Sequence, residues 1–187
     1  MSWPEGAWTR VSVTVDGRAP TEVSDVWWLV AHGVFADLRV LRTAAPTDLP
    51  YSDTQAFAGT CTWDPATREM RWHHLVDTEV RDPDIAGHVW PDADDPRVMH
   101  EAGPGFTERW VRIDPDATPA ATHVVDDTVA VAVGRLAIVV TATGAARFAL
   151  AVDTWTVLDA VGPHPPAALP PDLVARLSGM PPHPPPD

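Results

Sequence analysis

Residues 56–77, AFAGTCTWDPATREMRWHHLVD, decide the fold class of this chain. Two strand-forming runs, residues 56–63 and 69–77, flank the tetrapeptide DPAT (64–67). A proline at the second position of such a tetrapeptide is typical of a type I turn. Short apolar and aromatic runs that are separated by turn residues are typical of antiparallel strands. The stretch therefore predicts a β-hairpin and an antiparallel sheet.

The same pattern continues on both sides of this hairpin. Turn signals such as Asp16-Gly17 and Gly134-Arg135 recur at short spacing, and the runs between them are rich in Val, Thr and Trp. The spacing gives about ten short strands, which is the range in which antiparallel sheets close on themselves or fold into sandwiches. We therefore predict an all-β fold in which residues 1–162 form a single closed antiparallel barrel of about 8–10 strands.

Residues 163–187 have a different composition, which is rich in proline. Within them, two prolines precede residues 172–178, and Gly179 follows, so this island carries the start and stop signals of a helix. Leu173, Val174 and Leu177 would form a narrow apolar stripe on it. We predict a Pro-rich tail with one short helix that docks on the barrel.

The charge of the chain excludes some partners. The formal net charge is −13, and all 13 basic residues are arginines. Such an acidic protein lacks the basic face that a phosphate backbone or an anionic membrane needs, so we predict no nucleic-acid partner and no membrane partner. No apolar run approaches the about 18–20 residues of a spanning helix, and MSWPEGAWTR has no secretory pattern. These features predict a cytoplasmic protein.

The nine tryptophans of this chain have two interpretations. Indole rings supply large apolar area, so they can simply fill a core. Alternatively, they line a pocket for a small apolar or aromatic ligand. Composition alone favours the first interpretation.

Strand alternation sorts charged and aromatic side chains onto common faces. In residues 34–41, Phe35, Asp37 and Arg39 share one face, and in residues 106–113 Glu108 shares one with Trp110. A buried charge needs a partner or a purpose, so these faces suit the inside of a ligand-holding barrel. We predict that Phe35, Trp63 and Trp110 form apolar walls, while Asp37 and Arg39 bind and orient a polar group of the ligand. The alternative is an outer face with cross-strand ion pairs.

Proton transfer is the chemistry that this residue set leaves most open, because it needs only a histidine or a carboxylate in a dry pocket. We predict His73, steadied by Asp77, as the proton-transfer residue and Glu108 as the second choice. Glu101 is a further candidate. His74 is the rival of His73, since a shift of one residue in strand register exchanges the inward and outward faces.

Other chemistries find less support in the sequence. The adjacent His73 and His74 point to opposite faces of a strand, so they cannot bind one ion, and no other residues have the spacing of metal ligands. Cys61 lies in mid-strand between two threonines, where a small packed residue is expected, and as the one cysteine it can form no internal disulfide. No Gly-rich phosphate loop occurs. We therefore predict no cofactor and no metal.

The chain also resembles a known superfamily. Its order of short strands with a late helix is similar to the calycins, and Gly6-Ala7-Trp8 is similar to the Gly-x-Trp that opens the first lipocalin strand. A poorly characterised bacterial group of calycin-like proteins shows a closer similarity over roughly residues 6–160. That resemblance rests on VFADLRV (34–40), AFAG (56–59), Trp72-His73 with Asp77, and Glu101, Gly103, Glu108 and Trp110. It implies a barrel with a small-molecule pocket, and it implies no particular reaction.

Three functions follow as hypotheses. The first is a small-molecule-binding barrel that works as a cofactor-free acid–base enzyme of the lyase, isomerase or hydrolase type on an apolar or aromatic ligand. The second is a non-catalytic carrier or sensor of a small hydrophobic ligand. The third is a filled barrel with a structural or partner-binding role. A cavity with a titratable group at its base would favour the first.

Overall fold

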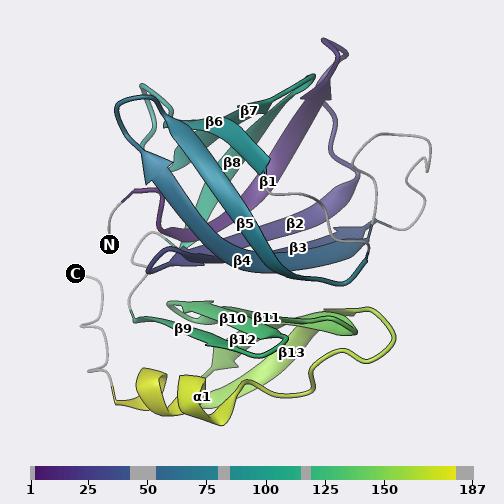
Figure 1. Ribbon diagram of the computed structural model, residues 1–187, viewed down its shortest axis with the longest axis vertical. Coiled ribbons are helices and arrows are strands. Elements are labelled where there is room, and N and C mark those ends of the chain that lie inside the picture. The colour runs from purple at the N-terminus through teal and green to yellow at the C-terminus, as the bar shows by residue number, and fades with distance from the viewer. Residues whose placement is uncertain (1–2, 43–53, 80–84, 115–118, 180–187) are drawn as a thin grey trace.

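The computed structural model describes residues 3–42, 54–79, 85–114 and 119–179. Within these residues the chain forms thirteen strands and one short helix, which are arranged in three layers (Figure 1). The fold is all-β, as the sequence predicts. No helix in the described part of the chain is long and apolar enough to span a membrane.

The first eight strands close into an antiparallel barrel in which each strand pairs with its neighbours in sequence and β8 pairs with β1. They are β1 (Gly6–Val15), β2 (Ser24–Ala31), β3 (Val34–Leu41), β4 (Gln55–Asp64), β5 (Glu69–Asp77), β6 (Ile85–Pro91), β7 (Val98–Gly103) and β8 (Phe106–Asp114). The hairpin of residues 56–77 is β4 and β5. Its turn is held by Asp64, whose carboxylate accepts hydrogen bonds from the Ala66 amide at 2.8 Å and the Thr67 hydroxyl at 3.0 Å.

The next five strands form a separate antiparallel sheet of order β13-β12-β11-β10-β9. They are β9 (Ala120–Val125), β10 (Thr128–Val133), β11 (Leu136–Thr141), β12 (Gly144–Ala151) and β13 (Thr154–Val161). The sequence assigned residues 1–162 to one barrel, whereas the structure divides these strands between the barrel and the second sheet. The physical reason is closure: once β8 pairs with β1, the barrel has no free edge for β9.

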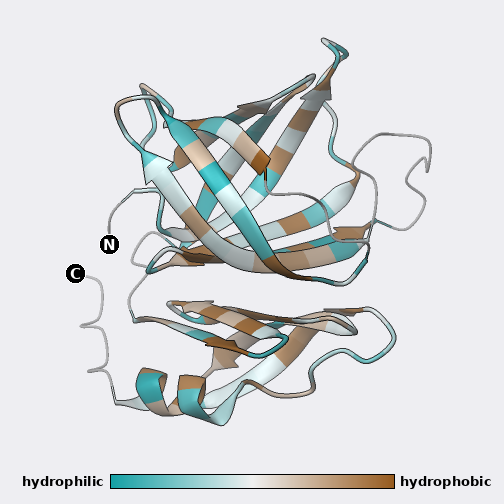
Figure 2. Ribbon diagram, in the orientation of Figure 1, coloured by the Kyte–Doolittle hydropathy of each residue, from teal (hydrophilic) through white to brown (hydrophobic). Residues whose placement is uncertain are grey.

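The second sheet covers the outer face of barrel strands β2, β3 and β4 (Figure 1). Small and branched side chains fill the interface, among them Ala36 and Leu38 of the barrel and Val131 and Ile138 of the sheet. Figure 2 shows the apolar colouring of both layers where they face each other. β3 is therefore buried on both of its faces.

Helix α1 (Pro171–Ser178) covers the far side of the second sheet, close to the predicted range 172–178. Leu173 is fully buried there, and Val174 and Leu177 pack around it. Asp172 pairs with His123 of β9 at 2.8 Å. The helix thus docks on the second sheet and not on the barrel itself. The Pro-rich residues 180–187 lie outside the described residues.

The inside of the barrel holds most of the large aromatic side chains. Trp8, Trp28, Phe35, Trp72 and Trp110 are buried there, together with Met70 and Met99. At one end of the barrel the Trp8 indole donates to the Pro4 carbonyl at 2.8 Å, so the N-terminal segment folds over that end. Tryptophan therefore fills the core, as the simpler interpretation of the composition holds. The other end of the barrel interior is polar.

Candidate functional site

Charged side chains gather inside the barrel toward the end where β3 stops and β4 begins, at the right in Figure 1. Strand alternation directs them inward from β1, β3, β5, β7 and β8. Buried charges are costly unless they are paired. Their pairing therefore decides what this end of the barrel can do.

Arg10 of β1 is the centre of the largest buried ion-pair network. Its guanidinium donates to Glu108 of β8 at 2.6 Å and to Glu22 at 2.7 and 3.2 Å. Arg10 and Glu108 are 2% and 5% exposed, so the pair is shielded from water. Burial disfavours the charged guanidinium, but Glu108 and Glu22 outweigh that effect and hold the pKa of Arg10 above its ordinary value. Arg10 therefore keeps its positive charge at neutral pH.

Asp37 and Arg39 form the second pair, on the inward face of β3. The Arg39 guanidinium donates to both oxygens of Asp37, at 2.9 and 3.4 Å, and lies 4.9 Å above the ring of Phe57. Burial opposes the Arg39 charge, while Asp37 and Glu108 raise the pKa of Arg39 above its ordinary value. Asp37 and Arg39 are two residues apart on one strand, so their side chains lie on the same face.

Glu101 of β7 is the carboxylate with the most unusual environment. It stands directly opposite Glu108 across β7 and β8, so two acidic side chains face the same interior. Among the described residues, no hydrogen bond or ion pair involves its carboxyl group. Burial, followed by the negative charge of Glu108, raises the pKa of Glu101 well above its ordinary value. Glu101 is therefore a carboxyl group that keeps its proton to a higher pH than an ordinary glutamate does.

A β-bulge brings His74 and Asp77 of β5 together. Ala58 pairs with Val76 and Gly59 with His74, so Leu75 is the extra residue of β5. In a regular strand, two residues three positions apart point to opposite faces, but the bulge turns His74 and Asp77 to the same face. His74 Nδ1 lies 2.9 Å from Asp77 Oδ1. The His74 ring also stacks on Phe57, with 4.8 Å between ring centroids.

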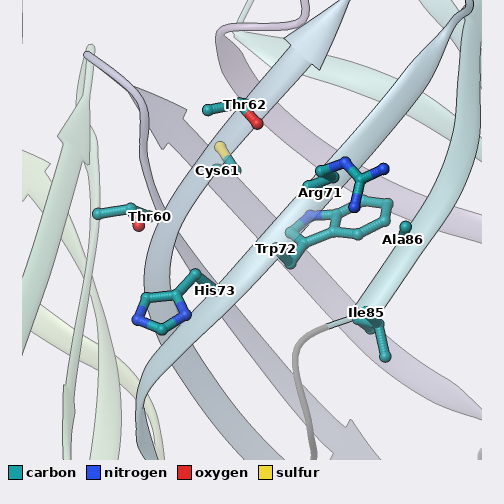
Figure 3. Close-up of a pocket in the computed structure, with 8 residues that line it drawn as sticks. All are labelled: Thr60, Cys61, Thr62, Arg71, Trp72, His73, Ile85 and Ala86. Atoms are coloured by element: carbon teal, nitrogen blue, oxygen red, sulfur yellow. The ribbon is translucent and has the colours of Figure 1, made fainter.

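His73 has its side chain on the outer surface, so the structure corrects the predicted inward face in favour of the rival His74. Its ring lies in a shallow outer groove of about 260 Å³ together with Thr60, Thr62 and Arg71 (Figure 3). The predicted contact of His73 with Asp77 needs both side chains on one face, which their even spacing would give in a regular strand. The bulge at Leu75 reverses that parity.

A small cavity lies among these charged groups and has a volume of about 30 Å³. Its walls are Trp28, Asp37, Arg39, Phe57, Trp72, Ile85, Glu101 and Trp110. Ile85 is 46% exposed, so the cavity reaches the protein surface at that wall. The Trp110 indole N–H is buried and has no hydrogen-bond partner among the described residues. A cavity of this size suits a water molecule or one small polar group.

Apart from His73 and Asp77, the predicted site residues fall into three groups. Asp37, Arg39 and Trp110 line the cavity. Phe35 and Glu108 are buried beside it, Phe35 against the His74 ring at 5.7 Å. Trp63 lies at the opposite end of the barrel.

Sequence reasoning missed several residues of this end of the barrel. They are Arg10, Glu22, Trp28, Phe57 and Trp72. Arg10 lies two residues after Trp8 in the first strand, so both side chains point to the same face of the strand. This spacing was the signal that the Arg10 guanidinium points into the barrel. Glu22 precedes its strand, so alternation carries no information about it.

The opposite end of the barrel holds a larger and more apolar cleft of about 360 Å³. Its walls include Trp3, Pro4, Val30, Trp63 and Met70. Trp3 and Trp63 meet edge to face, with 4.4 Å between ring centroids. Two indoles and aliphatic side chains suit an apolar ligand, and the volume lies in the range of small-molecule pockets.

Cys61 lies at the base of this cleft and is 8% exposed. Burial, followed by the charge of Glu5, raises the pKa of its thiol to about 12. The thiol is therefore protonated and weakly nucleophilic at neutral pH. This environment agrees with the prediction that Cys61 is a packed residue.

Comparisons with known proteins identify a fold and no family. No protein-family profile and no curated protein matches the sequence. Among solved structures, the chain is similar to the crystal structure of the uncharacterised protein YLR301w from Saccharomyces cerevisiae. The TM-score is 0.61 at 14% sequence identity, and the match covers 84% of this chain and 85% of that chain. At this identity the similarity shows a shared fold alone.

Proposed function

We propose that the protein binds a small molecule in the cavity lined by Asp37, Arg39 and Glu101, and that Glu101 exchanges a proton with it. The observation that carries the proposal is a carboxyl group of raised pKa on the wall of a cavity that reaches the surface. Perturbed carboxyl groups in clefts are typical of acid–base sites. This function deepens the prediction of a cofactor-free acid–base enzyme, with Glu101 in the place that His73 was expected to fill.

The remaining groups of the cavity have supporting roles in this proposal. The Asp37–Arg39 pair fixes the polar side of the ligand, and the Trp110 ring is part of the aromatic wall. His74 does not line the cavity, but it stacks on Phe57, which does. His74 and Asp77 are therefore positioning residues that hold the Phe57 ring. Glu108 acts through Arg10 and through its charge on Glu101.

A ligand screen with a matched pair of variants tests the proposal. Trp28, Trp72 and Trp110 line the cavity, so occupancy should change tryptophan fluorescence saturably. We expect at least one compound from a panel of small cationic, neutral and anionic molecules to bind, and Glu101→Gln to weaken that binding. Glu79→Gln, at an exposed site, is the control. Deuterium transfer from solvent into the bound compound would report the proton exchange. Equal binding by both variants would contradict the proposal.

Membership of the calycin superfamily is part of the same proposal. A closed eight-stranded antiparallel barrel fits that superfamily, and Gly6-Ala7-Trp8 opens β1 with Trp8 fully buried. The guanidinium of Arg112, from the last barrel strand, lies 4.7 Å above the Trp8 ring and donates to the Glu5 carbonyl at 2.9 Å. These contacts hold the N-terminal segment against that end of the barrel.

The apolar cleft at Trp3 and Trp63 favours a second candidate function, a carrier of a small hydrophobic ligand. Its volume is about 360 Å³, and its walls are largely apolar. Indole or naphthalene titrations would test it. If this cleft is the site, Trp63→Leu should weaken binding while Glu101→Gln leaves it unchanged. The opposite result would assign binding to the polar cavity.

A further inference from the structure

We propose that the polar cavity takes the primary ammonium group of a small organic amine. This inference rests on the proposed function, since it names the ligand class of the same cavity. Charge balance, aromatic walls and size each support it.

The first argument is the balance of charge inside this end of the barrel. Five carboxyl side chains lie here, and two guanidinium groups oppose them; the acids are Glu22, Asp37, Asp77, Glu101 and Glu108. Arg10 is engaged by Glu22 and Glu108, and Arg39 is engaged by Asp37. Even when Glu101 holds its proton, the other four carboxyl groups outnumber the two guanidinium groups. Glu101 forms no direct ion pair with either guanidinium in the described part of the chain, although both attract its charge from a distance, so a cation in contact with Glu101 is what this interior lacks.

The second argument is the aromatic lining. Three indole rings and the Phe57 ring surround the cavity, and the rings of Trp28 and Trp110 lie 6.0 Å apart between centroids. The faces of aromatic rings attract cations, and tryptophan does so most strongly. The guanidinium of Arg39 already lies over Phe57 at 4.9 Å, so this environment accommodates a cation over a ring. Aromatic walls with carboxylates suit an ammonium group better than an anionic one.

The third argument is size, and it selects among cations. A volume of about 30 Å³ holds a group the size of a water molecule, which describes –NH₃⁺ and excludes a trimethylammonium head. Among the described residues, no three His, Cys, Asp or Glu side chains converge as metal ligands do. The ligand is therefore an organic amine, and its carbon chain would leave past the exposed Ile85.

Binding of the ammonium group should release a proton. Glu101 faces Glu108 of β8, Asp37 and Arg39 of β3, and Arg10 of β1. Burial and the two acidic groups raise the pKa of Glu101, and the two guanidinium groups oppose that rise only in part. The neighbouring β5 contributes His74 and Asp77 to the same interior. When R–NH₃⁺ enters, the Glu101 O–H bond breaks, its proton leaves to solvent, and the carboxylate pairs with the ammonium. The affinity should therefore rise with pH.

The experiment is a titration of the full chain with four compounds that share one benzyl group. Benzylamine is the probe, and benzyltrimethylammonium, benzyl alcohol and benzoate are its matched controls; Mg²⁺ and K⁺ are tested alone. We expect benzylamine to bind at least about tenfold more tightly than each control compound. Calorimetry in buffers of different ionisation enthalpy should show proton release. Glu101→Gln should remove both the preference for benzylamine and the release of a proton, and Glu79→Gln should keep both.

The outcomes separate the ligand class from the site. If benzoate or benzyl alcohol binds best and Glu101→Gln weakens it, the cavity is the site and the amine class is wrong. If no compound binds, or if Glu101→Gln leaves the binding unchanged, both the proposed function and the amine ligand class are wrong. Ile85→Trp provides a second variant, because it narrows the entrance without changing a charge. It should weaken benzylamine binding, and unchanged binding would also overturn the inference.

Discussion

Glu101 and Glu108 face each other directly across β7 and β8, and Arg10 pairs with Glu108 at 2.6 Å. Two like charges in such a position destabilise a sheet unless one is neutralised. The Arg10 guanidinium balances the charge of Glu108, while burial and the Glu108 charge raise the pKa of Glu101. This difference in environment between two directly paired glutamates is the basis of the acid–base proposal.

The raised pKa of Glu101 predicts a stability that depends on pH. Between the ordinary glutamate pKa and the raised one, the folded protein binds a proton that the unfolded chain has lost. This contribution therefore falls as pH rises, by about 1.4 kcal/mol for each unit of the difference. Glu101→Gln should remove this loss, so its stability relative to wild type should increase from pH 4 toward neutrality. Urea unfolding at several pH values measures it. A constant difference between the two proteins would contradict the raised pKa.

The Arg10 network predicts a large loss of stability on truncation. Arg10→Ala leaves Glu22 and Glu108 without their shared cation in the barrel interior. Breaking one side of a buried ion pair costs about 3–5 kcal/mol. Arg97→Ala is the control, since Arg97 pairs with Asp95 in full contact with solvent and should change little. Thermal melts of both variants decide the matter, and equal melting temperatures would show that the network is not structural.

The two adjacent histidines of β5 should differ sharply. His74 is 2% exposed and contacts Phe35, Phe57 and Asp77, so His74→Ala should cost about 2–4 kcal/mol and disturb ligand binding. His73→Ala changes an exposed side chain and should stay within about 0.5 kcal/mol of wild type. Chemical unfolding and fluorescence titration measure both effects. If His73→Ala weakened ligand binding more than His74→Ala does, the binding site would lie on the outer face of the barrel.

Gly59 should tolerate no side chain. A Cβ atom at this position would collide with the carbonyl oxygen of His73 on the paired strand. Gly59→Ala should therefore cost about 1–3 kcal/mol through displaced backbone and should separate His74 from Asp77, because the bulge that joins them lies opposite Gly59. Gly179→Ala, where φ is negative and a Cβ atom would meet only ordinary van der Waals contacts, controls for the loss of a glycine. Stability measurements and the histidine NMR signals test both points.

The C-terminal helix should matter more than the residues after it. Truncation after Gly179 removes only Pro-rich sequence and should leave the melting temperature nearly unchanged. Truncation before Pro170 removes the fully buried Leu173 and the contact of Asp172 with His123. The loss of one buried leucine alone costs about 2–5 kcal/mol. Equal melting temperatures for both truncations would show that the helix contributes nothing.

The sequence predicts the strands of this protein well because turns and alternation are local. The DPAT turn specifies the β4–β5 hairpin, and the parity of Phe35, Asp37 and Arg39 places all three inside the barrel. Which sheet a strand joins is not local. Both Leu38 and Val131 are buried apolar strand residues, yet they lie on opposite sides of one interface.

The site was harder to predict for the same reason. The bulge at Leu75 depends on pairing with the partner strand, which the sequence of one strand does not reveal. Simple alternation therefore assigned the inward face to His73 instead of His74. The convergence of Glu101 with Arg10 and Asp37 depends on barrel closure, which joins residues far apart in sequence. Tryptophan composition gave no way to separate the filled part of the interior from the lined cavity, because both use the same side chains.

The layer between the barrel and the second sheet makes the two halves dependent on each other. Leu29 and Leu38 would be exposed if the chain ended after β8, and Ile138 and Val140 would be exposed if it began at β9. Neither half is therefore an autonomous folding module. We expect one cooperative melting transition for residues 6–161, because the separation of the two sheets would expose a continuous hydrophobic surface on each. A gene fragment that encodes only the closed barrel would produce a chain prone to aggregation, however complete its hydrogen bonding.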